Sequence, residues 1–410
     1  MEKLLTSGSP QLMRRLNAAL VLRAIRDDGP ATRATLQRTT GLSKPTVREV
    51  VEFLIKTGYV SESPADGAAR GPGPRARLLS FRADLGYVLG IDIGANKILA
   101  LVADLSGRIV GSDRRPTDGS KGAEVVLAEA RTAVRRALDA AGVTRSSLKG
   151  VAVGTPGIVD PESGRVTLAP QLAGWEGIRL AEVLGRSFRC SVLVDNEVHL
   201  SVLAERWLGA ARGIDDVVYM QIGVGIGAGI LIGGEVYRGA HGAAGEIGYL
   251  PIPDGDDPPA AGLGHFEHAA GGSAFARLGR EAARGPEGAV LRQLAGGDPD
   301  AVDAEIVFAA AARGDKVAWR VLDELLDRLA RGLASAAALL NPATVIIGGG
   351  LSRAGDALLE PLERRVGELV ALPPRLVLSA LGDEAVALGA VHLATQSVDE
   401  RLFAFEEAAT

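Results

Sequence analysis

The chain has 410 residues, too many for one hydrophobic core, so we expect two or three domains. Its single cysteine excludes an intrachain disulfide, and the lack of a secretion signal or a long apolar run argues against secreted and membrane-spanning proteins. The net charge of −5 is unevenly distributed, because residues 1–82 hold 14 Lys and Arg against 7 Asp and Glu. A basic head on an acidic body is typical of a cytoplasmic protein that binds nucleic acid through its first domain.

The basic head begins with an amphipathic helix that we expect to end at residues 28–30, Asp-Gly-Pro. The apolar residues that define its helical spacing are Leu12, Leu16, Leu20, Val21 and Ile25. Thr32 then caps a short helix, which ends at Gly41 in the C-cap position. Ser43 caps a third helix, and Pro45 is tolerated in its first turn because an N–H there needs no partner within the helix. This order predicts a helix-turn-helix.

The third helix has the polarity of a recognition helix, whose first turns meet base edges while nearby cations bind phosphates. The residues of this helix that we expect to contact DNA are Ser43, Lys44, Thr46 and Arg48. Two strands follow and predict a wing. The wing residues that we expect at the DNA backbone or minor groove are Arg70, Arg75 and Arg77. Residues 10–82 are therefore predicted to form a winged helix-turn-helix; the alternative is a helical hairpin with a solvated basic face.

The acidic body contains strands that end in glycine-rich turns, the first of them a hairpin in which Asp92 ends a strand. Glycine in such turns lets a ligand approach the backbone closely. The strand-and-turn units lie at residues 87–110, 149–159, 217–234 and 343–351. Their order resembles the actin-like ATPase architecture, in which two α/β lobes face a cleft.

Residues 85–395 resemble, more narrowly, the ROK family of repressors, open reading frames and sugar kinases. The matching segments are DIGANK, GTPGIVD, VDNEVHLSVLAE, IGVGIGAGI, RGAHGAAGEIGY and VIIGGGL. The resemblance implies a two-lobed, ribonuclease H-like α/β body. It implies a first lobe at residues 85–195 to which a C-terminal helix at 384–397 returns, and a second lobe at 196–383 with the sugar site and a dimer surface. With the DNA-binding head, the resemblance specifies the repressor branch.

The resemblance also implies half of a sugar site at Asn196 and Glu197. In sugar kinases of the family a strand ends in Asn-Asp, and the Asp is the general base toward the sugar hydroxyl. Glu197 stands at that position here, and a carboxylate displaced by about 1 Å can lose on the order of a hundredfold in rate. We therefore expect Asn196 and Glu197 to bind sugar and Glu197 to be an inactive base. The alternative is that Glu197 only favours the helix N-terminus through its charge.

The second half of the implied sugar site contains two glutamates, Glu246 and Glu267, which suit vicinal hydroxyls because a carboxylate accepts charge-assisted hydrogen bonds. Gly157, in the turn of GTPGIVD, and Tyr249 complete the predicted sugar-binding set. Tyr249 replaces the histidine that binds zinc in the family.

A structural zinc is not expected, because four ligands are needed and nearly all are missing. The positions of the family's three cysteines fall near Pro258, Ala260 and His265. The cofactor prediction is therefore none.

An ATP site has weaker support in the residues, because the glycines that would receive phosphates are also needed for the turns of the fold. Ala95-Asn96 replaces the family's usual Gly-Thr in the first hairpin. The residues that would bind a nucleotide, with Mg²⁺, are Asp92, Gly94, Lys97, Gly223, Gly225 and Gly349.

These features predict a sugar-responsive repressor that binds operator DNA as a homodimer, or as a tetramer, and a monosaccharide as effector. Two heads of a dimer would occupy successive major grooves of an inverted repeat. The alternatives are an ATP-dependent sugar kinase that carries the head as an accessory, and an activator built from the same parts.

Overall fold

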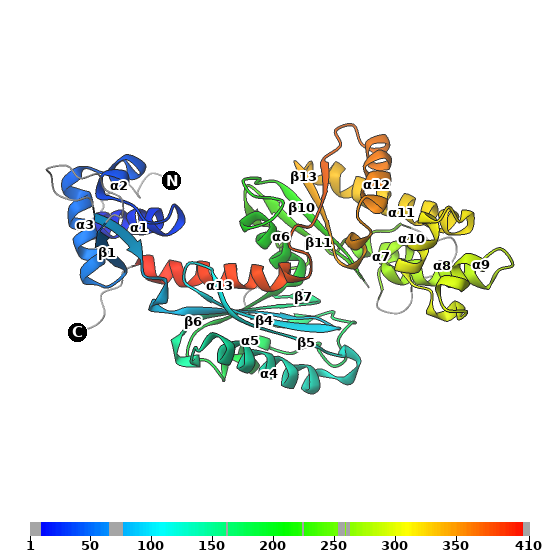
Figure 1. Ribbon diagram of the computed structural model, residues 1–410, viewed down its shortest axis with the longest axis horizontal. Coiled ribbons are helices and arrows are strands. Elements are labelled where there is room, and N and C mark those ends of the chain that lie inside the picture. Colours follow the sequence, from blue (N-terminus) through cyan, green and yellow to red (C-terminus); the bar gives the residue numbers. More distant parts are fainter. Residues whose placement is uncertain are drawn as a thin grey trace.

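The computed structural model describes residues 10–64, 77–160, 163–223, 225–252, 259 and 263–404. Figure 1 shows a small head at one end of the molecule and a body of two α/β lobes beside it. Within the described part of the chain, no helix combines the length and apolarity needed to cross a bilayer. The predicted α/β class with an N-terminal winged helix-turn-helix is confirmed.

The head contains three helices and a two-stranded antiparallel wing. Its elements are α1 (Pro10–Asp27), α2 (Arg33–Thr40), α3 (Lys44–Lys56), β1 (Val60–Pro64) and β2 (Arg77–Phe81). The caps lie where the sequence predicts them: Thr32 accepts a hydrogen bond from the Thr35 amide, and Ser43 accepts one from the Thr46 amide. Gly41 adopts the left-handed conformation, with φ of 70°, that ends α2.

The face of α1 that packs into the head differs in part from the prediction. Leu16 and Leu20 are 55% and 44% exposed, whereas Val21 and Ile25 are buried. The buried positions of α1 are Ala18, Val21, Leu22 and Ile25, which follow the spacing i, i+3, i+4, i+7. The predicted contribution of Leu16 and Leu20 to this core is therefore wrong, because a neighbouring stripe of the same helix faces α2 and α3.

The first lobe is built on a five-stranded sheet in the order β5-β4-β3-β6-β9. Its strands are β3 (Tyr87–Ile93), β4 (Lys97–Asp104), β5 (Ile109–Pro116), β6 (Leu148–Thr155) and β9 (Val192–Asn196). Helix α4 (Ala123–Ala141) covers one face and α13 (Ala385–Ala404) the other. Strand β3 is apolar and buried because both faces of the sheet are covered. The shorter elements are β7 (Ile158–Val159), β8 (Val166–Thr167) and α5 (Leu180–Gly185).

The second lobe has a sheet in the order β12-β11-β10-β13-β14, packed against a group of helices. Its strands are β10 (Val217–Ile222), β11 (Ile226–Ile232), β12 (Glu235–Val236), β13 (Thr344–Gly348) and β14 (Arg375–Leu378). Its helices are α7 (His265–Ala270), α8 (Gly272–Arg284), α9 (Ala289–Leu294), α10 (Ala304–Ala312), α11 (Lys316–Leu340) and α12 (Asp356–Leu369).

Helix α6 (Glu197–Trp207) lies between the lobes and packs on both α13 and β11. Two glycines allow this close approach. A Cβ at Gly389 of α13 would lie 1.9 Å from the carbonyl oxygen of Leu200, and one at Gly229 of β11 would lie 2.1 Å from that of Val198. The position of α6 is therefore set by backbone contacts on two sides.

The head is attached to the body through α13, which reaches from the first lobe to α1 (Figure 1). Phe81, at the end of the wing, packs against both the head core and the cluster beneath α13. Arg26 of α1 forms an ion pair with Asp399 of α13, and both side chains are largely buried.

Replacement of Gly389 by Ala is expected to destabilise the body by about 3 kcal/mol, because the added methyl group overlaps a backbone carbonyl that cannot rotate away. Gly367 of α12 has no atom within 4 Å of its Cβ position, so Gly367→Ala should be neutral or stabilise by up to about 1 kcal/mol. Urea unfolding of both variants tests this. Equal midpoints for the two would show that α6 and α13 can separate without cost.

Candidate functional site

A cavity of about 200 Å³ lies between the lobes at the N-terminus of α6. It is smaller than the roughly 300–1,000 Å³ typical of pockets for drug-sized ligands. All the residues predicted to bind sugar line it: Gly157, Asn196, Glu197, Glu246, Tyr249 and Glu267. Gln171 and Gln221 add two amide side chains that the sequence did not single out. We call this space, where the sequence predicts that a sugar binds, the sugar cavity.

Three carboxyl groups face the sugar cavity and all of them are desolvated. Burial raises the pKa of Glu197 to about 7 and that of Glu267 to about 7, and it also raises the pKa of Glu246. Glu267 Oε1 is buried and has no hydrogen-bond partner among the described residues. A buried acceptor without a donor is costly, so a ligand hydroxyl that donates to this atom would be favoured.

Asn196 holds the sugar cavity together as well as lining it. Its Oδ1 accepts from the Val198 amide at 2.8 Å, which caps α6, and its Nδ2 donates to the carbonyl oxygen of Gly157 at 2.8 Å. Gly157 has a φ of 94°, which favours glycine, and a Cβ there would lie 2.8 Å from that of Ala169. Much of the hydrogen-bonding capacity of Asn196 therefore goes to the protein itself.

Asp195, which the sequence did not single out, is buried and holds Asn196, which lines the sugar cavity. Its Oδ1 accepts from the Asn196 amide at 2.8 Å and from His199 Nδ1 at 2.8 Å. Its Oδ2 accepts from Arg238 Nη2 at 2.6 Å and Nε at 3.0 Å. Burial opposes ionisation, but the hydrogen bond from His199 and the nearby positive charges hold the pKa of Asp195 below its usual value. The Asp-x-x-x-His spacing was a usable signal for His199; nothing nearby in the sequence indicated Arg238.

A second cavity, of about 490 Å³, adjoins the first and is lined by five of the predicted nucleotide-binding residues. They are Asp92, Gly94, Lys97, Gly223 and Gly349. Gly225 instead lines the sugar cavity. Lys97 Nζ lies 2.7 Å from Asp92 Oδ2. Glu197 lines both cavities and so lies between them.

This second cavity has two arginines that the sequence did not single out. Arg114 and Arg353 each form an ion pair with Asp383, at 2.7 and 2.9 Å. Lys97 donates to the backbone carbonyl of the same residue. These three cationic side chains suit an anionic group such as a phosphate, although each is paired with Asp92 or Asp383 in this structure and Glu197 lines the same space. We call this space the anion cavity.

The described residues contain no group of three or more His, Cys, Asp or Glu side chains arranged to hold a metal ion. Two of the positions that correspond to the family's cysteines, Pro258 and Ala260, lie outside the described residues. His265 is exposed at the start of α7, and Tyr249 is 42% exposed at the edge of the sugar cavity.

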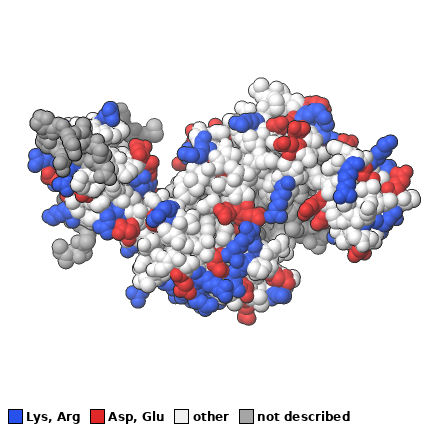
Figure 2. All heavy atoms as spheres, in the orientation of Figure 1, with Lys and Arg blue, Asp and Glu red and all other residues white. Residues whose placement is uncertain are grey.

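Helix α3, the predicted recognition helix, presents polar and basic side chains at its N-terminal end. Ser43, Lys44 and Arg48 are exposed, and Thr46 is half-buried with its hydroxyl 2.8 Å from that of Ser43. Arg48 forms an ion pair with Glu52 at 2.9 Å. Figure 2 shows further Lys and Arg side chains on the surface of the head.

The wing holds part of its basic charge in ion pairs. Arg77 lies 3.1 Å from Glu62 of the neighbouring strand, and Arg33 of α2 pairs with the same carboxylate. The sequence did not single out Glu62. Arg70 and Arg75 lie outside the described residues.

Because the pKa of Glu197 is raised from 4.5 to about 7 in the fold, the folded state holds its proton to higher pH than the unfolded state does. The stability that this proton provides is full below pH 4.5 and is lost as pH rises through about 7. Glu197→Gln removes the cost of ionising this desolvated carboxyl in the folded state. The stability of the variant relative to the wild type should therefore rise by about 3 kcal/mol between pH 4.5 and pH 8. Urea unfolding across that range measures it; Glu182→Gln, on the surface, should show no such trend.

Comparisons with known proteins agree with this arrangement. The ROK family model matches residues 88–397, and a model of winged helix-turn-helix DNA-binding domains matches residues 20–61. The chain is 30% identical over 391 residues to the xylose repressor of Caldicellulosiruptor bescii, covering 94% of this chain and 97% of that protein.

Solved structures give the same result. A ROK family glucokinase from Streptomyces griseus, in complex with glucose and AMPPNP, is 30% identical with a TM-score of 0.67, covering 76% of this chain and 100% of that one. A ROK family transcriptional regulator, a homologue of the Escherichia coli MLC protein, has the same fold with a TM-score of 0.75 at 23% identity, covering 96% of this chain and 98% of that one. The chain belongs to the ROK family and joins a winged helix-turn-helix DNA-binding domain to the two-lobed body of that family.

Proposed function

We propose that this protein is a sugar-responsive DNA-binding transcriptional regulator, a repressor of carbohydrate-metabolism genes that acts in the cytoplasm. One observation carries the proposal: a DNA-binding head shares the chain with a small cavity that gathers three glutamates, one of them buried with an unpartnered oxygen. The relation to a xylose repressor over 94% of the chain, head included, supports the same assignment.

The DNA-binding step uses the N-terminal end of α3. Ser43, Lys44 and Arg48 are exposed there, and they would meet the edges of bases and the phosphates beside them. A homodimer would present two such helices to the half-sites of an inverted repeat. Arg77 would have to break its ion pair with Glu62 before its guanidinium could bind a DNA phosphate.

The effector would be a monosaccharide in the sugar cavity. Glu246 and Glu267 would accept hydrogen bonds from adjacent hydroxyls, and the free Oε1 of Glu267 gives one such bond a defined place. Since the cavity contains residues of both lobes, a bound sugar would favour one arrangement of the lobes. Coupling between sugar and DNA then follows if the two arrangements hold the heads differently.

The second candidate function is an ATP-dependent sugar kinase, and one observation favours it. Glu197 lies between the sugar cavity and the anion cavity, and its pKa of about 7 suits a general base at neutral pH. Lys97, Arg114 and Arg353 would then bind the phosphates of the nucleotide. The two functions are distinguished by measuring ADP formed from ATP in the presence of D-xylose or D-glucose.

Lys44→Ala is expected to weaken DNA binding and to lower the slope of log K against log salt concentration by about 1, because one phosphate contact is lost. Lys316→Ala is the matched control, since Lys316 is also the first residue of a helix, α11, but lies in the second lobe. Fluorescence anisotropy with a duplex selected by the full-length protein from a random-sequence pool measures both. An unchanged slope in Lys44→Ala would remove this residue from the interface.

Glu246→Gln is expected to weaken sugar binding by about tenfold, because a charge-assisted hydrogen bond becomes a neutral one. Its DNA affinity without sugar should equal that of the wild type. Calorimetry with D-xylose and D-glucose gives the first quantity and anisotropy the second, with Glu182→Gln as the surface control. A wild-type protein whose DNA affinity is unaffected by any monosaccharide that it binds would contradict the proposed function.

A further inference from the structure

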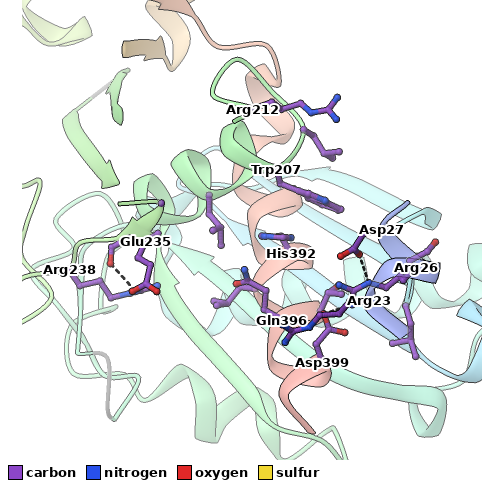
Figure 3. Close-up of a pocket in the computed structure, with 18 residues that line it drawn as sticks. Arg23, Arg26, Asp27, Trp207, Arg212, Glu235, Arg238, His392, Gln396 and Asp399 are labelled. Atoms are coloured by element: carbon purple, nitrogen blue, oxygen red, sulfur yellow. Dashed lines mark hydrogen bonds and ion pairs between the residues drawn. The ribbon is translucent and has the colours of Figure 1, made fainter. Parts of the chain in front are cut away.

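A third cavity, of about 960 Å³, lies where the head meets the body. Figure 3 shows Arg23, Arg26 and Asp27 of α1 on one side of it and Arg238 on the other. His392, Gln396 and Asp399 of α13 lie between these two sides. We call this space the interdomain cavity. A shift of the head relative to the body would change its shape.

Helix α6 connects the sugar cavity to the interdomain cavity. Its N-cap, Asn196, and its first residue, Glu197, line the sugar cavity, and Trp207 at its other end lines the interdomain cavity. Trp207 stacks on His392 of α13 with ring centroids 4.8 Å apart. Because α6 has 11 residues, the two cavities are separated by a rigid element about 16 Å long.

Arg238 makes a more direct connection, since it contributes to both regions. Its guanidinium holds Asp195 with two hydrogen bonds, and Asp195 in turn accepts from the amide of Asn196 and from His199. His199 Nε2 lies 3.3 Å from the carbonyl oxygen of Ala244, two residues before Glu246. The same Arg238 side chain is 32% exposed and lines the interdomain cavity.

We propose that Arg238 is the positioning residue through which the sugar cavity controls the DNA-binding head. This inference rests on the proposed function and identifies the residue through which sugar binding would affect the head. A sugar that draws in the segment before Glu246 acts on His199 and, through it, on Asp195. Arg238 then either moves with Asp195 or loses its hydrogen bonds to it. Either event moves the positive charge of Arg238 within a cavity that also holds Arg23, Arg26 and the carboxylates of Asp27, Glu235 and Asp399. The favoured position of the head changes as a result.

This route requires that sugar binding and DNA binding both shift the same equilibrium, between two positions of the head relative to the body. Arg26 is held to the body by its ion pair with Asp399, so a change of charge nearby acts on an existing attachment. Coupling of this kind typically changes affinities by about 5- to 150-fold.

The test compares full-length wild type with Arg238→Met and with Arg212→Met, a matched control because Arg212 lines the same cavity. For each protein, sugar affinity is measured by calorimetry with D-xylose and D-glucose. DNA affinity is measured by anisotropy on the selected duplex, without sugar and with sugar at saturation for that protein. In Arg238→Met the ratio of the two DNA affinities should fall to within about twofold of one, and in Arg212→Met it should match the wild type.

Measuring DNA affinity at saturating sugar distinguishes the proposed role of Arg238 from a purely structural one. If the role were purely structural, Arg238→Met would weaken sugar binding, but the ratio of the two DNA affinities would equal that of the wild type once the site is full. A wild-type ratio in Arg238→Met at saturation overturns the inference. A wild-type protein whose DNA affinity is the same without sugar and at saturating sugar overturns the proposed function instead. The two failures are therefore distinguishable.

A double variant covers the case in which Arg238→Met does not fold because Asp195 is left buried with fewer partners. Arg238→Met combined with Asp195→Asn removes both charges, and its ratio should be within about twofold of one, as should that of Asp195→Asn alone. A wild-type ratio in the double variant contradicts the inference.

Discussion

The close packing of α6 between α13 and β11 is the constraint on which the other features depend. Two glycines, Gly389 and Gly229, let the backbone of α6 touch its neighbours on both sides. Because the helix cannot slide, Asn196 at its start is fixed against the turn at Gly157, and Trp207 at its end is fixed against α13. The same contacts therefore position residues that line both the sugar cavity and the interdomain cavity.

The sequence indicated the parts that depend on local chemistry. The helix-turn-helix could be predicted because its helix ends depend on interactions within a few residues. These are the caps at Thr32 and Ser43 and the left-handed conformation of Gly41. The residues expected at the sugar cavity came from motifs at strand ends and turns. Parallel strands bring such ends to one edge of a sheet, which is why separate motifs meet in one cavity.

What the sequence did not indicate depends on contacts between distant positions. Arg238 and Asp195 are 43 residues apart, and Arg114 and Asp383 are 269 residues apart. Neither pair has a spacing that a local pattern could reveal. The exposed Leu16 and Leu20 have a different cause: two apolar stripes of α1 share the helical period, and only tertiary packing decides which one is buried.

The return of α13 to the first lobe has a consequence for synthesis on the ribosome. The head and the strands of the first sheet emerge early, but the helix that covers one face of that sheet begins at residue 385. Until then Val88, Leu99 and Leu101 have no partner from α13, and a nascent chain would carry an uncovered apolar face through most of translation. Attachment of the head through Arg26 and Asp399 waits for the same segment, so the orientation of the DNA-binding domain is among the last features to form.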